Sequence, residues 1–207
     1  MRARRLKRLH SAGAIYEKSG GPGPPRRRIR TCLKRQILKP MTQPDEKRDE
    51  RTVGDSRSEY SEICLPNDTN TLGTMLGGHV MHLVDLCGAI AAMRHARGPV
   101  VTASVDHMTF LHPVHVGELV LLKSQVNRAF RTSMEVGVKV WVENLQTNEI
   151  KHTSSAYLTF VAVDNSRCGV VVPPIRPETE EEIRRYEQAA ERRAHRLAMK
   201  DRARSKN

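Results

Sequence analysis

The chain has 207 residues, a length that suits one domain of ordinary size with additional tails. Its net charge of +12 is unevenly placed, because residues 1–44 hold 13 of the 35 Lys and Arg residues and a single acid, Glu17. The other residues carry no net charge, so the excess belongs to an N-terminal arm and says little about the folded part. No apolar run approaches the length of a transmembrane helix, which argues against a membrane-spanning chain.

Residues 1–55 are predicted to form a basic arm without stable structure, since the runs RARRLKR and PRRRIR flank the breaker-rich GGPGPP. Contact with nucleic acid, attraction to an anionic membrane and targeting to an organelle are all compatible with this composition. No secretory apolar segment is evident. The four cysteines show no CxxC spacing: Cys32, Cys64, Cys87 and Cys168. We therefore expect a cytoplasmic protein with free thiols, with an organelle as the alternative location.

The ordered domain is expected over residues 56–172. The segment YSEICL at 60–65 fits a short strand, and PNDTNTLGT has the residues of a loop. A helix is predicted from about Gly78 to Ala96, where the following RGP stops it. This helix is apolar on nearly every side, which predicts that other structure wraps it.

Four strand-like runs follow the predicted helix, at 100–113, 117–130, 133–144 and 152–164. The third alternates strictly and places five apolar residues on one face: Met134, Val136, Val138, Val140 and Val142. Short links between the runs favour antiparallel hairpins. One apolar helix followed by an antiparallel sheet predicts an α+β domain in which the sheet curls round the helix.

Residues 173–207 are predicted to form a linker and a charged helix. Thr179 and Glu182 have the spacing of a capping box, with acids in the first turn and bases in the last. The apolar stripe of this helix is thin and consists of Ile183, Tyr186, Ala190 and Leu197. We expect a solvated helix that rests lightly on the sheet or on a neighbouring subunit, without a direct role in chemistry.

Asp85 is the unusual residue of the central helix, because a carboxylate among apolar neighbours is costly to ionise. Gly77 and Gly78 stand where the loop enters the helix, and free N–H groups at that point suit a developing oxyanion. Asp85 lies two turns further along on roughly the same side, and Asn70 in the preceding loop can orient a water or a carbonyl. The alternative for Asp85 is a structural carboxylate that is hydrogen-bonded within the fold.

Four motifs in order resemble the hotdog-fold acyl-CoA thioesterases: DTN…G…GG…D…GAI, VVTASVD…TFL, RTSMEVGVKVW and YLTFVAVD. The similarity covers about residues 60–164 and continues into the tail. It is strongest to the branch of bacterial single-domain acyl-CoA hydrolases and the cytosolic acyl-CoA hydrolase of animals. The resemblance implies a hotdog fold, in which an antiparallel sheet wraps one long helix, here followed by a C-terminal helix.

The resemblance also implies a reaction, the hydrolysis of acyl-CoA to a fatty acid and coenzyme A without a cofactor. Asp85 would take the place of the catalytic aspartate, Asn70 that of the active-site asparagine, and Gly77 and Gly78 those of the oxyanion-binding glycines. Asp85 would activate water or attack the thioester directly, and the sequence does not separate these routes. Sites of this family lie between subunits, so a homodimer is expected, with dimers assembling into hexamers.

The coenzyme A end is expected near Arg131, Thr132 and Ser133, which the family uses close to the nucleotide and pantetheine. Ordinary hairpin-turn residues are the alternative for each of the three. No metal is expected, because the spacing of His79, His82 and Asp85 does not form a zinc-binding pattern.

Two other functions are the alternatives. One is a hotdog domain that binds acyl-CoA without cleaving it, as a sensor or scaffold. The other is an acyl-CoA hydratase or dehydratase, for which His82 is the only candidate histidine. Thr102 and Asp106 lie on the next predicted strand, and no role is assigned to either.

Overall fold

The computed structural model describes residues 49–106 and 108–204. Most of the predicted basic arm, including Glu17 and Cys32, lies outside these residues. The ordered part begins earlier than predicted, since Arg51–Thr52 form the short strand β1, which pairs in parallel with β7, Ile175–Arg176. Val53, directly after β1, is fully buried, so this segment belongs to the folded domain. Among the described helices, none is both long and apolar enough to cross a bilayer.

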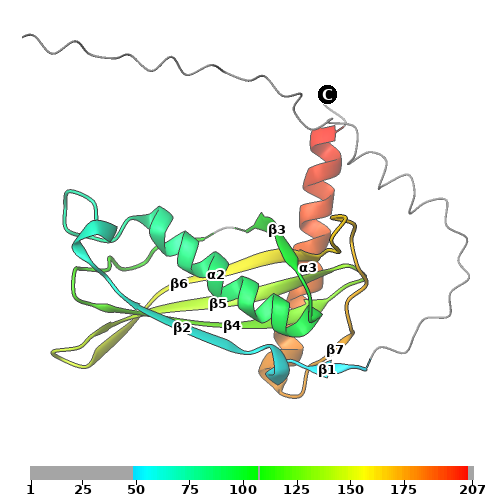
Figure 1. The fold of residues 1–207 in the computed structure, drawn as a ribbon, viewed down its shortest axis with the longest axis horizontal. Helices are drawn as coiled ribbons and strands as arrows, with labels where there is room; N and C mark the ends of the chain where they lie inside the picture. Colours follow the sequence, from blue (N-terminus) through cyan, green and yellow to red (C-terminus); the bar gives the residue numbers. More distant parts are fainter. Residues whose placement is uncertain (1–48, 107, 205–207) are drawn as a thin grey trace, which may run out of the picture. The chain divides into compact units, whose positions relative to one another are not determined.

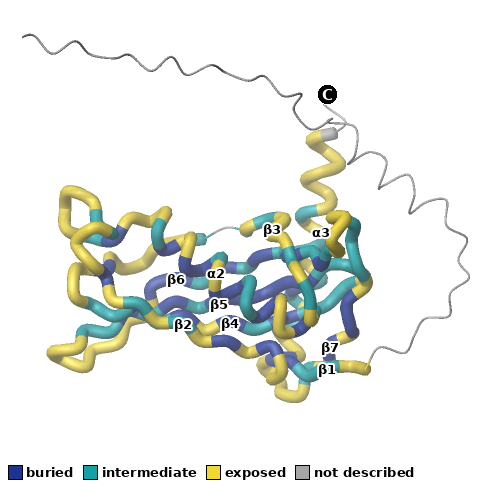
Figure 2. The backbone as a smooth tube through the Cα atoms, in the orientation of Figure 1, coloured by how far each residue is buried: buried dark blue, intermediate teal, exposed yellow. Residues whose placement is uncertain are grey.

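A five-stranded antiparallel sheet forms the body of the domain (Figure 1). Its strands in spatial order are β2 (Ser58–Ile63), β4 (Leu119–Ala129), β5 (Ser133–Asn144), β6 (Glu149–Ala162) and β3 (Val100–Val105). The predicted strands are thus confirmed, although the first run after the helix ends as a strand at Val105. β2 and β3 are the two edges, and the long central strands cross the middle of the sheet, where the buried residues concentrate (Figure 2). Two short 3₁₀ turns, Gly54–Ser56 and Pro66–Asp68, flank β2.

The central helix α2 runs from Gly77 to Ala96, as predicted to within one residue, and lies across one face of the sheet (Figure 1). The residues that it buries follow helical spacing: Val80, Leu83, Val84, Cys87, Gly88, Ala91, Ala92 and His95. Gly88 allows the helix to pack closely against the sheet, because a Cβ there would lie only 3.1 Å from Cε2 of Phe160 on β6. The helix ends at Arg97, whose φ of 54° is left-handed and turns the chain towards β3.

The opposite side of α2 is uncovered in the single chain. Met81 is 45% exposed, Leu86 38% and Met93 44%, although an apolar helix was predicted to be wrapped by other structure. The prediction is correct for only one face, because a single sheet can cover only one side of a helix. A second apolar surface is therefore left for another molecule to cover.

The second helix, α3 (Glu180–Arg204), lies over the other face of the sheet. The predicted capping box is present: the Thr179 Oγ1 accepts the Glu182 N–H at 3.3 Å, and the Glu182 carboxylate accepts the Thr179 N–H at 3.2 Å. The predicted apolar stripe is only partly covered, since Ile183 is 45% and Leu197 50% exposed, whereas Tyr186 packs against the core. This partial cover is what a helix resting lightly on the sheet should show.

Charged groups dock α3. Glu135 on β5 is fully buried, and its carboxylate accepts hydrogen bonds from Arg192 at 2.7 Å and from Arg196 at 3.4 Å. Arg196 also pairs with Asp106 just after β3, at 2.5 Å. A buried carboxylate requires such partners, because an isolated charge in the interior is strongly disfavoured. Odd-numbered β5 residues face α3, whereas the even-numbered valines face α2, so the strict alternation in the sequence produces a sheet with two different faces.

Two of the four cysteines can be compared with the expectation of free thiols. Cys64 and Cys87 are free and buried, as expected of reduced thiols. Burial raises the pKa of both thiols, so neither is a reactive thiolate at neutral pH.

Candidate active site

Asp85 lies in the middle of α2, on the side that the sheet does not cover. Its carboxylate Oδ1 accepts a hydrogen bond of 2.7 Å from the hydroxyl of Thr102 on the edge strand β3. The side chain is half-buried, and this bond leaves acceptor capacity on the carboxylate for a water or a substrate. Asp85 is thus held in one orientation while it still faces the open side of the molecule.

Thr102 is the site residue that the sequence analysis missed. It lies at an irregularity of β3, where the pairing register with β6 shifts between Thr102 and Ser104. Such a bulge changes which face a side chain occupies, so the alternation of the strand could not assign Thr102 to the Asp85 side. The signal in the sequence was weak, because Thr102 is one of two hydroxyl residues, with Ser104, in this edge strand.

The start of α2 offers two backbone donors. The N-cap residue Leu76 donates its own N–H to Asp68 O, and the His79 N–H bonds to Leu76 O. Between them, the N–H groups of Gly77 and Gly78 have no acceptor among the residues described. Free N–H groups at a helix start carry partial positive charge, so an anionic oxygen would be stabilised there.

Asn70 lies in the loop before α2 and organises its own turn. Its Oδ1 accepts the Leu72 N–H at 2.8 Å, and its Nδ2 donates to Thr74 Oγ1 at 3.0 Å. These bonds fix the amide of an exposed side chain, which would otherwise sample several rotamers. Asn70 is thereby preorganised at the same end of the molecule as Gly77 and Gly78.

Glu62, Asp68 and His79 support this end of the site. Nε2 of His79 lies 2.9 Å from Glu62 on β2, and its Nδ1 lies 3.9 Å from Asp68. The Tyr60 hydroxyl and then His79 hydrogen-bond the Glu62 carboxylate and lower its pKa. The ligand atoms of these three residues lie within 4.8 Å of one another and could hold a cation, but their contacts already satisfy each other. Their evident effect is to tie the loop that carries Asn70 to the helix start.

Arg131, Thr132 and Ser133 form the β4–β5 hairpin. Their backbone carbonyls accept N–H groups from Val172, Ala162 and Phe130 respectively, which fixes the turn. The register places Met134, Phe160 and Thr102 on adjacent strands, so the hairpin lies at the same end of the sheet as Thr102. The structure therefore brings these residues towards the Asp85–Thr102 pair, without a direct contact between them.

Asp85 follows Gly78 by two helical turns, which corresponds to about 10 Å along the axis. The Asp85 side chain points back towards the helix start, so its carboxylate lies closer to the glycine N–H groups than its backbone does. That both groups act on one reacting centre stays a prediction, either within one chain or between two chains.

Comparison with known proteins identifies the family. Residues 72–148 match the Thioesterase superfamily. YkhA of Bacillus subtilis, named an uncharacterized acyl-CoA thioester hydrolase, is 40% identical over 142 residues, covering 69% of this chain and 83% of that protein. The chain belongs to the thioesterase superfamily. It is thereby placed among the thioester hydrolases, as the resemblance predicted.

Solved structures agree with this assignment and with the hotdog fold. An acyl-CoA hydrolase from Staphylococcus aureus, in complex with butyryl coenzyme A, coenzyme A and coenzyme A disulfide, matches with a TM-score of 0.71 and 33% identity over 76% of this chain and 96% of that chain. That hydrolase has also been solved with an aspartate, a threonine or an asparagine replaced by alanine. A hexameric acyl-CoA thioesterase is 43% identical, with a TM-score of 0.69 over 74% of this chain and 97% of that one.

Proposed function

We propose that this member of the superfamily hydrolyses acyl-CoA, with Asp85 as its catalytic acid–base residue. The observation that carries the proposal is the Thr102–Asp85 hydrogen bond, which orients a carboxylate on the open side of α2. The three residues replaced by alanine in the Staphylococcus aureus hydrolase are of the same types as Asn70, Asp85 and Thr102 and have the same spacing along the chain. This correspondence supports a shared site.

The reaction follows from these groups. Water attacks the thioester carbonyl carbon while Asp85 takes a proton from it, and the carbonyl oxygen becomes an oxyanion. The Gly77 and Gly78 N–H groups hold that oxyanion, and the Asn70 amide orients the carbonyl or the water. Collapse of the intermediate breaks the C–S bond, and the coenzyme A thiolate leaves with the proton held by Asp85. Direct attack by Asp85 would form a transient anhydride that water then opens.

The site is proposed to form between two subunits, with Gly77, Gly78 and Asn70 of one chain facing Asp85 of a second copy. The resemblance to a family whose sites lie between subunits supports this arrangement. The uncovered apolar side of α2 and the edge strand β3, with Val101 48% and Val105 43% exposed, supply a surface for that partner. Assembly of dimers into a hexamer is proposed from the hexameric relative.

Thiol release tests the function directly. The full chain is incubated with a panel of acyl-CoAs from acetyl to palmitoyl, and free coenzyme A is measured with a thiol reagent. We expect turnover with at least one chain length. Binding of the same acyl-CoAs without thiol release would instead favour the alternative, a sensor or scaffold that does not hydrolyse its ligand.

Complementation tests the shared site. Asp85→Ala and Asn70→Ala chains, each inactive alone, are mixed, unfolded and refolded together. A random mixture forms mixed dimers in half of the cases, and each has one intact site, so about a quarter of wild-type activity should return. No recovery, with mixed dimers demonstrated by mass spectrometry, would show that both residues act within one chain.

A further inference from the structure

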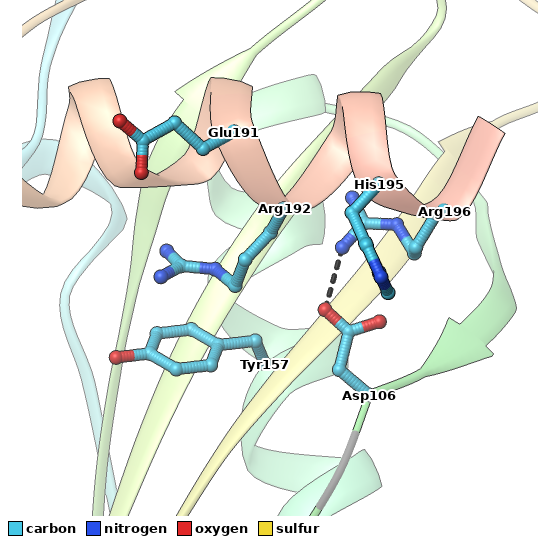
Figure 3. A pocket seen from close by; sticks show the side chains of 6 residues that line it. All are labelled: Asp106, Tyr157, Glu191, Arg192, His195 and Arg196. Atoms are coloured by element: carbon cyan, nitrogen blue, oxygen red, sulfur yellow. Dashed lines mark hydrogen bonds and ion pairs between the residues drawn. The ribbon is translucent and has the colours of Figure 1, made fainter. Parts of the chain in front are cut away.

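A groove lies under the second half of α3, on the face of the sheet opposite α2. Its volume is about 590 Å³, and its walls come from α3, the end of β3, the outer face of β6 and the β4–β5 hairpin. A neighbouring hollow of about 580 Å³ shares Asp106, His195 and Arg196 with it (Figure 3). The α3 side of the groove is a single stripe, because Arg193, Leu197 and Lys200 have i, i+4, i+7 spacing.

Most cations near the groove already have partners. Arg192 lies over the Tyr157 ring at 3.7 Å and pairs with the buried Glu135, and Arg196 reaches Asp106 (Figure 3). These contacts fix the helix, so the groove has a defined shape without any ligand. Arg192 and Arg196 therefore have structural roles, and their charges are already paired with Glu135 and Asp106.

Arg193 differs from these neighbours. Its guanidinium stacks on the Phe130 ring at 3.9 Å, and within residues 49–106 and 108–204 no carboxylate lies at ion-pair distance from it. Burial and then the nearby charges of Arg196 and Arg128 lower its pKa. A half-buried cation that is repelled by two others and has no counter-charge gains stability when an anion binds.

The groove also offers hydroxyl groups and apolar walls. Ser104, Ser133 and Thr159 line it, and the buried Thr159 Oγ1 has no hydrogen-bond partner among the described residues. A guanidinium with several hydroxyls is the donor set that phosphate groups prefer. Leu197 and Met199 add apolar surface on the same wall, which suits the flat face of a base.

We propose that this groove binds the phosphate-bearing nucleotide end of coenzyme A, with Arg193 as its principal anion contact and Lys200 at its mouth. The inference rests on the proposed function for its natural ligand. The course of β3 supports the proposal, because it connects the two places. Thr102 faces Asp85, and the next four residues, 103–106, line the groove. The long pantetheine arm would connect the two places across this end of the domain, and Ser133 of the predicted coenzyme A region is a wall of the groove.

The test compares two substrates that differ only in the nucleotide. Butyryl-CoA and butyryl-pantetheine are hydrolysed by the full-length wild-type protein and by Arg193→Gln, Arg193→Lys and Arg184→Gln. Arg184 is the matched control, since it is an exposed arginine on the same helix that does not line the groove. Calorimetry with adenosine 3′,5′-bisphosphate measures binding of the nucleotide alone.

We expect Arg193→Gln to lower the ratio of kcat/KM for butyryl-CoA to that for butyryl-pantetheine roughly tenfold, through KM. Arg193→Lys should recover most of the ratio, and Arg184→Gln should leave it unchanged. An unchanged ratio in Arg193→Gln would overturn the proposal. Bisphosphate binding that depends on Arg193 while the ratio is unchanged would also overturn it, by assigning the groove to a free nucleotide. Absence of hydrolysis of both substrates by the wild type would instead refute the proposed function, and bisphosphate binding would still test the groove.

Discussion

The two faces of the sheet hold their helices by different chemistry. On one face, α2 packs with small and apolar residues, and Gly88 brings it close enough to touch Phe160. On the other face, α3 is fixed by a fully buried carboxylate, Glu135, and two arginines. The apolar contact is non-directional, so it leaves the far side of α2 uncovered and available to another subunit. The ionic contact is directional, and it fixes α3 over a groove lined with cations.

The two faces also hold carboxylates with different roles. The apolar face holds the one candidate acid–base residue, Asp85, whose carboxylate is held by a single hydroxyl and remains available. Glu135 is equally a carboxylate in an apolar domain, but its partners occupy it completely. We infer that the number of partners, more than burial, distinguishes a reactive carboxylate from a structural one in this fold.

Replacing Asp85 gives the largest expected effect on activity. Asp85→Ala should lower kcat on the order of 10³-fold, because a positioned acid–base group contributes about 10²–10⁴. Oligomer size and circular dichroism should match the wild type, since the half-buried side chain makes one hydrogen bond within the chain. Glu59→Ala serves as the control, as Glu59 is an exposed carboxylate paired with Lys123. Wild-type turnover in Asp85→Ala would show that this carboxylate is structural.

Replacing Glu135 gives the largest expected effect on stability. Glu135→Ala leaves Arg192 and Arg196 without their shared buried partner, which should cost about 3 kcal/mol of unfolding free energy. Urea denaturation at fixed protein concentration measures it. Glu181→Ala is the control, because its exposed pairs with Arg184 and Arg185 on the same helix and with Lys139 on β5 contribute only about 0.3 kcal/mol each. A loss in Glu135→Ala as small as in this control would mean that α3 is held by packing alone.

Elements with a regular residue pattern could be predicted from the sequence alone. The alternation from Met134 to Val142 predicted the central strand and its two faces, and the capping pair Thr179–Glu182 predicted the start of α3. Asp85, Asn70 and the two glycines could be selected because a carboxylate, an amide and a helix start are unusual among apolar residues. Each of these inferences uses only residues close together in the chain.

Contacts between distant segments could not be predicted in the same way. The partner of Asp85 is 17 positions away and depends on an irregular strand. The alternation of β5 places Glu135 on the face opposite the valines, but nothing near it in the sequence indicates that Arg192, 57 positions later, covers it. β1 was missed for the same reason, since a strand of two residues exists only through its partner, β7. The arginine contacts of α3 could not be read from its thin apolar stripe, because Arg192 and Arg196 find their partner, Glu135, on a distant strand.

Gly88 tests the close apolar packing on the α2 face. Gly88→Ala should destabilise the domain by about 1 kcal/mol, because the new methyl group would press on the buried Phe160 and outweigh the better helix propensity of alanine. Gly98→Ala is the control, since a Cβ there meets no atom within 4 Å. Thermal unfolding of both variants measures the difference. A stabilised Gly88→Ala protein would show that Phe160 can move and that the α2 face is less tightly packed than the structure indicates.

His95 provides the smallest expected effect, at the buried end of α2. Its Nε2 lies 2.9 Å from Pro173 O. Burial lowers its pKa below the ordinary value of about 6.5, and Arg51 acts in the same direction, whereas the hydrogen bond with Pro173 and the charge of Asp55 act against it. Above pH 6.5 the imidazole is neutral in both states and does not alter stability. As the pH falls below 6.5, the unfolded chain binds the proton and the folded chain does not, so stability decreases until the folded pKa is reached.

Between pH 7.5 and 5.5, the wild type should therefore lose about 1 kcal/mol more unfolding free energy than His95→Gln, which retains a donor for Pro173 O but does not titrate. Urea denaturation of both proteins at the two pH values measures this difference, and the comparison cancels the carboxylates and other histidines that the proteins share. Equal losses would mean that His95 accepts its proton in the folded state. The α2 face would then hold a buried charge as the α3 face does, and the two faces would differ only in how many charges they bury.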